Sequence, residues 1–227
     1  MPEKERTNKK HTTPIVQSKG QLAIILSKIK GFNEAKVSLE QYQTDSEVAA
    51  SVLWNAFLSG DLQNKKIVDL GSGTGILGLG TMLLGASELV FVEIDKTASE
   101  TCKNNFSALK SECSGDFLAS FRTEDVSDTT GVFDVAIMNP PFGTKKEHAD
   151  RVFLQKAIEL APVVYSFHKA STFGFVQAFA KDNGFKITHH WQFLFPLKQT
   201  MKHHTKKIQR INVVCVRLEK QRNSNHC

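Results

Sequence analysis

The sequence is poor in cysteine, and its cysteines stand far apart. There are four, at positions Cys102, Cys113, Cys215 and Cys227, with no C-x-x-C pair among them. Zinc sites and disulfide frameworks both need cysteines at short or regular spacings. The sequence therefore predicts no metal site and no disulfide framework, and a reducing compartment is the natural interpretation.

Long apolar runs are lacking as well. No stretch of about 18 consecutive apolar residues occurs, so we expect no membrane-spanning helix. Residues 1–10 lack the apolar core of a secretory signal, and Glu3 and Glu5 are atypical of an organelle transit peptide. The sequence thus predicts neither a membrane anchor nor an export signal.

What remains is the composition of one α/β domain. The chain has 227 residues, 41% of them hydrophobic and 23% charged, and this length can bury a substantial core. We predict a disordered basic tail over 1–19, a domain over 20–219 and a flexible tail over 220–227. The net charge of +6 fits either a polyanionic partner or a role in solubility. The N-terminal tail is open to both interpretations, a weak nucleic-acid-binding arm or a solvated end.

A glycine-rich turn follows the first predicted strand, 66–70. The turn contains Gly71, Gly73 and Gly75, and an apolar helix follows it. Strand, glycine turn and helix in this order are typical of nucleotide sites, because glycines let a ligand lie against the backbone. The spacing differs from the G-x-G-x-x-G of dinucleotide sites. With Asp69 in front, it resembles motif I of class I S-adenosylmethionine-dependent methyltransferases. A tight turn in an unrelated α/β protein is the alternative.

Acidic residues follow the next two predicted strands. Strand 88–94 carries Glu93, about 20 residues past the glycines, where a carboxylate can accept hydrogen bonds from both ribose hydroxyls. Its neighbour Asp95 is expected to cap the helix over 96–109. Strand 117–122 is followed by Asp125, which can accept from an adenine amino group. For Asp125 the alternative is an ordinary loop acid.

The fourth predicted strand, 133–138, leads into Asn139, Pro140, Pro141 and Phe142. In open α/β sheets ligands bind at the carboxyl ends of the strands. The Asn139 side-chain oxygen and the Pro140 carbonyl can each accept one N–H of a planar amine and turn its lone pair toward a methyl group. The prolines fix φ and remove backbone donors. Phe142 offers a ring for a splayed-out base, and Tyr42 is a candidate for a second face.

The other predicted elements complete a seven-stranded, Rossmann-like class I methyltransferase sheet with helices on both faces. They are helices from Leu22 to about Gly31, 46–58, 151–160 and 171–183, and strands 162–167, 185–195 and 208–218, the last two as an antiparallel pair. The segment between this pair is basic and contains no acid. Its Lys198, Lys202, Lys206 and Lys207, with Arg210 just beyond, could hold an RNA strand. A solvated hairpin loop is the competing interpretation.

Three segments together resemble the methyltransferase-like protein 5 family: 39–44 (Leu-Glu-Gln-Tyr-Gln-Thr), 139–145 (Asn-Pro-Pro-Phe-Gly-Thr-Lys) and 164–169 (Val-Tyr-Ser-Phe-His-Lys). The resemblance covers about residues 20–219. It implies methylation of N6 of one adenosine in small-subunit ribosomal RNA, together with a small zinc-binding activator protein. It also implies a cytoplasmic or nuclear (nucleolar) location in a eukaryote. We expect the activator at a sheet edge near Phe117, Leu118 and Phe121.

The resemblance adds cofactor contacts to those that the strand ends indicate. The complete predicted set for S-adenosylmethionine is Gln41, Thr44, Asp69, Gly71, Gly73, Thr74, Gly75, Ile76, Glu93, Asp125, Val126 and Asn139. Thr74 stands where some family members have cysteine, and the ribose acid is Glu rather than Asp. The basic tail is longer than is usual in the family. A protein glutamine-amide methyltransferase and an inactive RNA-binding scaffold are the rival readings of the same motifs.

Overall fold

The computed structural model describes residues 13–113, 117–142, 149–197 and 209–221. Its strands are β1 Lys66–Leu70, β2 Glu88–Val92, β3 Leu118–Arg122, β4 Val135–Met138, β5 Val163–Lys169, β6 Phe185–Leu197 and β7 Gln209–Lys220. Its helices are α1 Lys19–Leu26, α2 Ser46–Leu58, α3 Ile76–Leu83, α4 Lys96–Glu112, α5 Ala149–Leu160 and α6 Phe173–Asp182. Three short 3-10 turns, η1 Val37–Leu39, η2 Val126–Asp128 and η3 Ala170–Thr172, join them.

All seven strands form one sheet, in the order β3-β2-β1-β4-β5-β7-β6. The first five are parallel, and β7 is antiparallel to both of its neighbours, β5 and β6. The predicted seven-stranded Rossmann-like sheet is therefore confirmed. Chain order reverses between β1 and β4, and in such sheets ligands bind outside the carboxyl ends of the strands at this point.

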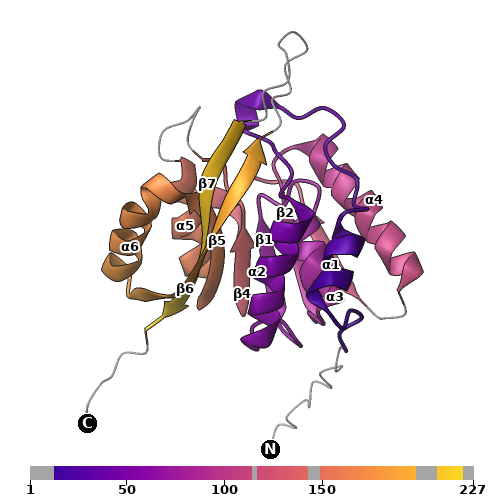
Figure 1. Ribbon diagram of the computed structural model, residues 1–227, viewed down its shortest axis with the longest axis horizontal. Helices are drawn as coiled ribbons and strands as arrows, with labels where there is room; N and C mark the ends of the chain where they lie inside the picture. The colour runs from indigo at the N-terminus through magenta and orange to yellow at the C-terminus, as the bar shows by residue number, and fades with distance from the viewer. Residues whose placement is uncertain (1–12, 114–116, 143–148, 198–208, 222–227) are drawn as a thin grey trace, which may run out of the picture.

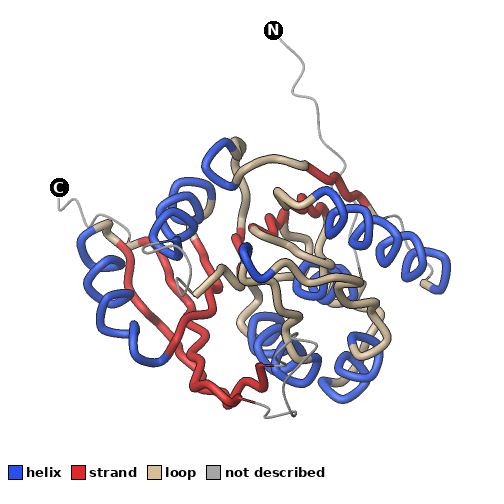
Figure 2. Tube along the Cα trace, turned by 90° about the horizontal axis from the view of Figure 1, so that it is seen from above, coloured by secondary structure: helices blue, strands red, loops and turns tan. Residues whose placement is uncertain are grey.

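Helices cover both faces of the sheet (Figures 1 and 2). One apolar cluster joins α1, α2, α3 and α4 to side chains of one face, among them Ile67, Phe91 and Tyr165. The other joins α5 and α6 to the opposite face, through residues such as Val68 and Val164. This alternation of inward side chains follows from the two-residue period of a strand.

Several predicted boundaries differ from the structure by up to about five residues. The first helix ends at Leu26 rather than near Gly31, β4 begins at Val135, and α6 begins at Phe173 after a 3-10 turn. The domain also begins before residue 20, since the Ile15 N–H donates to the Leu83 carbonyl and Val16 is 1% exposed. Helix ends and strand ends are the positions where local pattern is weakest, because a single tertiary contact extends or shortens them.

Helix ends follow the capping chemistry that the sequence predicts. Asp45 accepts hydrogen bonds from two backbone N–H groups at the start of α2, and Asp95 accepts one from Thr97 N–H at the start of α4. Gly184 follows α6 with a φ of +74°, the left-handed conformation that glycine adopts at little cost. These local signals fix how each helix enters and leaves the sheet.

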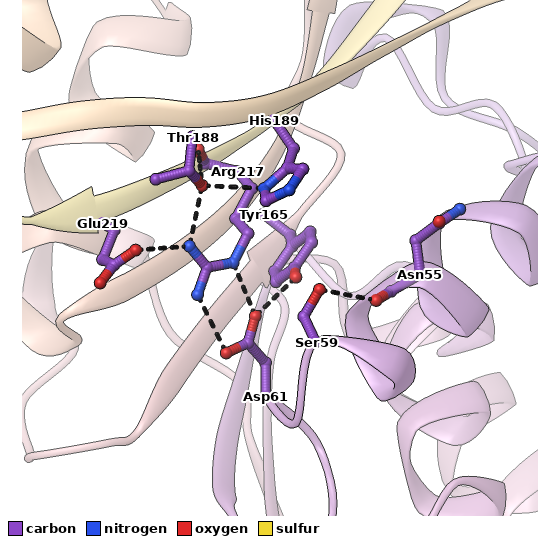
Figure 3. Close-up of polar contacts among 8 residues, drawn as sticks. All are labelled: Asn55, Ser59, Asp61, Tyr165, Thr188, His189, Arg217 and Glu219. Carbon is purple, nitrogen blue, oxygen red and sulfur yellow. Dashed lines mark hydrogen bonds and ion pairs between the residues drawn. The ribbon is translucent and has the colours of Figure 1, made fainter.

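A buried polar cluster ties the segment after α2 to the sheet (Figure 3). The Arg217 guanidinium on β7 donates to both carboxylate oxygens of Asp61, at 2.7 and 3.1 Å, and the Tyr165 hydroxyl on β5 donates to the same carboxylate at 2.6 Å. Arg217 also donates to Glu219 at the more exposed end of the cluster. A two-point contact of this kind fixes position as well as charge.

None of the helices in the described part of the chain combines the length and the apolar character that crossing a bilayer requires.

We predict that Asp61→Ala lowers the free energy of unfolding by about 3–5 kcal/mol, because it removes the buried partner of Arg217 and leaves only the more exposed Glu219. Glu219→Ala is the matched control. Its side chain is 41% exposed, so its loss should cost about 1 kcal/mol or less. Chemical denaturation followed by circular dichroism measures both. Equal losses for the two variants would contradict the structural role given to Asp61.

Candidate active site

A cavity of about 600 Å³ opens at the carboxyl ends of the parallel strands. Side chains from the glycine turn, from both acidic strand ends and from the end of β4 line it, and the segment between η1 and α2 borders it. The lining residues are Phe32, 38–44, Asp69, 71–74, Ile76, Leu77, Glu93, Ile94, 125–127, Asn139, Pro141, Val152 and Phe153. The structure thus brings together segments that lie up to about 120 residues apart in the chain, as the strand-end argument predicts.

The glycine turn is held in a shape that other residues would not adopt. Gly73 has a φ of +54°, and a Cβ added there would lie 2.8 Å from the Phe32 ring. Gly75 has a φ of +92°, and a Cβ there would lie 2.5 Å from the Cys102 sulfur. Gly71, Gly73, Thr74 and Ile76 line the cavity, whereas Gly75 faces the interior. Gly75 therefore shapes the turn at its N-cap position on α3 rather than the cavity wall.

Glu93 connects the end of β2 to the glycine turn. One carboxylate oxygen accepts the Gly73 N–H at 2.8 Å, and the other accepts the Asp95 N–H at 2.9 Å. Burial raises the pKa of Glu93, although the backbone hydrogen bonds oppose this shift. Each oxygen keeps a second lone pair, so the carboxylate can still accept from a ligand hydroxyl in the cavity that it borders.

Asp69 is almost fully buried, although the sequence predicts it as a cofactor contact. It is 2% exposed, and its carboxylate accepts the Gly78 N–H at 2.9 Å. Burial raises the pKa of Asp69 to about 7, the Gly78 N–H opposes the rise, and the charge of Glu93 adds to it. Asp69 reaches the cavity floor, and its main contact anchors the first turn of α3 to the end of β1.

Asp125 and Val126 border the cavity beside the end of β3. Asp125 caps η2 by accepting from Ser127 N–H at 2.8 Å. The structure thus gives Asp125 the capping contact of a loop acid and also places it at the cavity. Its acceptance of a hydrogen bond from an adenine amino group stays a prediction.

The segment that contains Gln41, Tyr42 and Thr44 closes over the site. Gln41 donates to Asp95 at 2.8 Å, and Lys36 donates to the same carboxylate at 2.8 Å. Burial alone would raise the pKa of Asp95. The Lys36 and Gln41 hydrogen bonds outweigh it, so the pKa of Asp95 is lowered overall. Gln41 therefore secures this segment to the start of α4 while it lines the cavity.

Thr44 reaches the opposite side of the site, where β4 ends. The Asn139 amide nitrogen donates to the Thr44 hydroxyl at 2.9 Å. This contact turns the Asn139 side-chain oxygen away from Thr44. The Tyr42 hydroxyl donates to that oxygen at 3.2 Å and lies 3.4 Å from the Pro140 carbonyl oxygen. The two acceptors that the sequence predicts for an amine thus converge on one donor position.

Phe142 differs from the expectation of an open stacking platform. Its side chain is only 8% exposed, and its ring packs against Tyr42 with centroids 5.1 Å apart. Pro140 and Phe142 are not among the lining residues, whereas Asn139 and Pro141 are. Tyr42 therefore stands between Phe142 and the cavity.

The Tyr-Ser-Phe-His-Lys segment at the end of β5 lies behind the site. Ser166 and His168 are 0% and 1% exposed, and a 2.7 Å hydrogen bond joins their side chains. His168 also faces Asp150 of α5 across 3.9 Å. Burial lowers the pKa of His168, while Asp150 opposes the shift. This segment ties α5 to β5 rather than forming part of the cavity wall.

Several lining residues were not predicted from the sequence. Phe32, Ile94, Leu77 and Phe153 carry no signal that separates them from core residues, and only the fold brings Phe153 of α5 next to Gly71. Among the predicted RNA-binding residues, Lys198, Lys202, Lys206 and Lys207 lie outside the described residues. Arg210 is exposed at the start of β7.

The edge predicted for the activator is only partly apolar at its surface. β3 is an edge strand of the sheet, and Leu118 is 64% exposed. Phe117 is 7% exposed, and the ring of Phe121 stacks on Phe91 with centroids 5.0 Å apart. Leu118 is therefore the residue of the three that presents its side chain at this edge, because Phe117 is buried and Phe121 packs against Phe106 of α4. Docking of an activator at this edge stays a prediction.

The chain is similar to known proteins over most of its length. Residues 43–189 match the family described as "Methyltransferase small domain". The rRNA N(6)-adenosine-methyltransferase METTL5 of Danio rerio is 36% identical, with 87% of this chain and 96% of that one covered. The Drosophila melanogaster enzyme of the same name is 32% identical over 86% of this chain and 92% of its own. A solved structure from Pyrococcus horikoshii is 42% identical, with a TM-score of 0.82 over 91% of this chain and 99% of that one.

The sheet order, the glycine turn and the acidic strand ends define a class I methyltransferase, and S-adenosylmethionine is its cofactor. The cavity fits this cofactor, because the backbone of Gly73 lines it beside the Glu93 carboxylate and the apolar Phe32, Ile94 and Phe153 border the rest. Within this class the chain belongs to the METTL5 family.

We predict that Glu93→Ala raises the dissociation constant of S-adenosylmethionine roughly ten- to a hundredfold. The variant loses a charged acceptor, and hydrogen bonds to charged groups contribute about 1.5–3 kcal/mol. Glu100→Ala is the control, since Glu100 is exposed on α4 and pairs with Lys103. Isothermal titration measures both constants. An affinity within about twofold of wild type for Glu93→Ala would refute the ribose assignment.

Proposed function

We propose that this chain transfers a methyl group from S-adenosylmethionine to N6 of one adenosine in small-subunit ribosomal RNA. The observation that carries the proposal is that two acceptors converge on one donor. The Tyr42 hydroxyl lies 3.2 Å from Asn139 Oδ1 and 3.4 Å from the Pro140 carbonyl oxygen. Two acceptors aimed at one point suit a nitrogen that carries two N–H groups. Membership of a family whose zebrafish and fruit-fly members are named for rRNA N6-adenosine methylation supports adenosine as the owner of that nitrogen.

The exocyclic amine of adenine is a poor nucleophile, because its lone pair is delocalised into the ring. S-adenosylmethionine supplies an electrophilic methyl group when it is bound. Asn139 and Pro140 each hold one N–H, which turns the nitrogen lone pair out of the ring plane and toward the cofactor side of the cavity. Methyl transfer would leave the sulfur with the electron pair of the broken bond as a thioether, and the amine proton that becomes acidic would pass to water. Positioning and electrostatics therefore supply the catalysis, without a strong base.

Asn139 is fixed for this task before any substrate arrives. Its amide nitrogen is held by Thr44, which is 5% exposed, so the amide plane has one favoured orientation. Pre-organised acceptors need no rearrangement during the reaction, and this is the source of most transition-state stabilisation of this kind.

RNA binding is assigned to the basic segment between β6 and β7. Lys198, Lys202, Lys206 and Lys207 lie outside the described residues, and Arg210 is exposed where β7 begins. Lysine and arginine neutralise phosphates, and each such contact steepens the salt dependence of binding by about 0.7 for single strands. A salt slope unchanged by joint replacement of Lys202, Lys206 and Lys207 would contradict this assignment.

The small zinc-binding activator is assigned to the β3 edge. β3 ends the sheet on one side, and edge strands present backbone groups that another chain can pair with. Leu118, 64% exposed on this strand, supplies an apolar contact.

We predict that Leu118→Arg weakens binding of the purified activator at least tenfold, a loss of about 1.4 kcal/mol, because it places a charge in an apolar contact. Ile24→Arg is the control, since Ile24 is 62% exposed on α1 and not on an edge strand. Titration of the activator against each variant measures the effect. Equal affinities of the two variants for the activator would contradict docking at the β3 edge.

We predict that Asn139→Ala lowers the rate of methyl transfer to unmodified small-subunit ribosomal RNA roughly a hundredfold or more, as loss of one pre-organised polar contact does elsewhere. Asn104→Ala, at an exposed position of α4, is the control. The assay uses labelled cofactor with purified RNA, with and without the activator, and mass spectrometry of the nucleosides. Methyl groups found on protein glutamine, with none on adenosine, would overturn the proposed substrate.

A further inference from the structure

The side chain of Tyr42 occupies the region that the amine and ring of the substrate would need. Its hydroxyl lies 3.2 Å from Asn139 Oδ1 and 3.4 Å from the Pro140 carbonyl oxygen, the two acceptors assigned to the amine. Its ring packs on Phe142, with centroids 5.1 Å apart and planes inclined by 35°. One residue therefore satisfies the polar and the aromatic contacts of the site together.

We propose that Tyr42 is a placeholder for the substrate base, which a flipped adenine displaces when it enters. The proposal rests on the proposed function, since it assigns the displaced contacts to the amine and ring of adenine. The placeholder keeps Asn139 and Pro140 paired and keeps water from the ring of Phe142 while no base is bound.

The contacts of Tyr42 are strong enough to hold it and weak enough to be replaced. A phenol has one proton, which it shares between two acceptors at distances on the long side for an O–H donor. An adenine amine has two protons and satisfies both acceptors at once. The exchange therefore favours the substrate. A base that lacks the amino group gains nothing from it, so the placeholder also contributes to specificity.

The backbone around Tyr42 is suited to movement. Residues 40–45 belong to no helix or strand, between η1 and α2. Glu40, two residues before Tyr42, has a φ of +51°, which a non-glycine residue adopts at a cost. A second ring, Phe195, meets Tyr42 edge-on with centroids 5.9 Å apart. Burial and the charge of Glu40 raise the pKa of Tyr42, so the hydroxyl remains a donor at neutral pH.

The test is Tyr42→Phe, which keeps the ring and removes the hydroxyl. Tyr165→Phe is the matched control, because its hydroxyl bonds to Asp61 in a fully buried place. We expect Tyr42→Phe to lower the KM for unmodified small-subunit ribosomal RNA about two- to tenfold. The reason is that the base no longer has to break the hydrogen bond of Tyr42, and one net hydrogen bond corresponds to a change of this size. The cofactor dissociation constant should stay unchanged. Tyr165→Phe should lower the thermal midpoint and leave the KM unchanged.

A KM for Tyr42→Phe that is unchanged or raised would overturn the proposal, and a fall in kcat at constant KM would make the hydroxyl a participant in the reaction instead. A wild-type protein that methylates no adenosine would contradict the proposed function rather than the placeholder.

A second measurement tests the proposal even if the Tyr42→Phe variant folds poorly. The chain has only two tyrosines, Tyr42 and Tyr165, so 3-fluorotyrosine labelling gives two fluorine resonances that Tyr165→Phe assigns. Binding of the ribosomal RNA in the presence of S-adenosylhomocysteine should shift the Tyr42 resonance and leave that of Tyr165 in place. Saturation with RNA that leaves both resonances unmoved would overturn the displacement.

Discussion

The hydrogen bond from the Gly73 N–H to the Glu93 carboxylate, 2.8 Å long, joins the turn after β1 to the end of β2. It fixes the backbone of the turn in a left-handed conformation that glycine adopts at little cost. Because the same carboxylate also accepts the Asp95 N–H, the start of α4 is held in register with the turn. The main chain of the glycine turn therefore forms one wall of the cavity, and the buried Glu93 side chain holds it in place. Its shape depends on the strand order, which places β1 and β2 side by side.

The segment before α2 links the two halves of the site. Lys36 and Gln41 bond to Asp95 on the cofactor side, while Tyr42 and Thr44 bond to Asn139 on the acceptor side. The contacts on the two sides are joined by fewer than ten residues of backbone. This arrangement gives cofactor binding and substrate entry a common physical element, and it explains why a polar segment without regular structure belongs to the active site.

Much of this site could be predicted, because its residues stand at strand ends that the apolar pattern marks. The sequence predicts Asp95 as a helix cap and places Gly73 and Glu93 at the ends of two strands, and the structure confirms these positions. The hydrogen bond between Gly73 and Glu93 was not predicted. The contribution of Phe153 could not be predicted, since it depends on how α5 packs over the turn. The direction of the Phe121 side chain could not be predicted for a related reason: in a strand, facing direction alternates, and only the register with β2 decides which residues point to α4. The contacts of Tyr42 follow from a loop conformation that no local pattern encodes.

The position of β7 has a consequence for how the chain assembles. β7, which follows the other six strands of the sheet along the chain, lies between β5 and β6 rather than at the edge of the sheet. Until the residues of β7 leave the ribosome, β6 has no neighbour in the sheet. Asp61 also lacks its partner Arg217 until then, because Arg217 lies 156 positions further along the chain. Contacts so distant in sequence form slowly, and chains in this state expose unpaired strands. A nascent chain that stops short of β7 would therefore lack the strand that joins β6 to the rest of the sheet, together with the buried partner of Asp61, and it would expose unpaired strand edges to protein quality control.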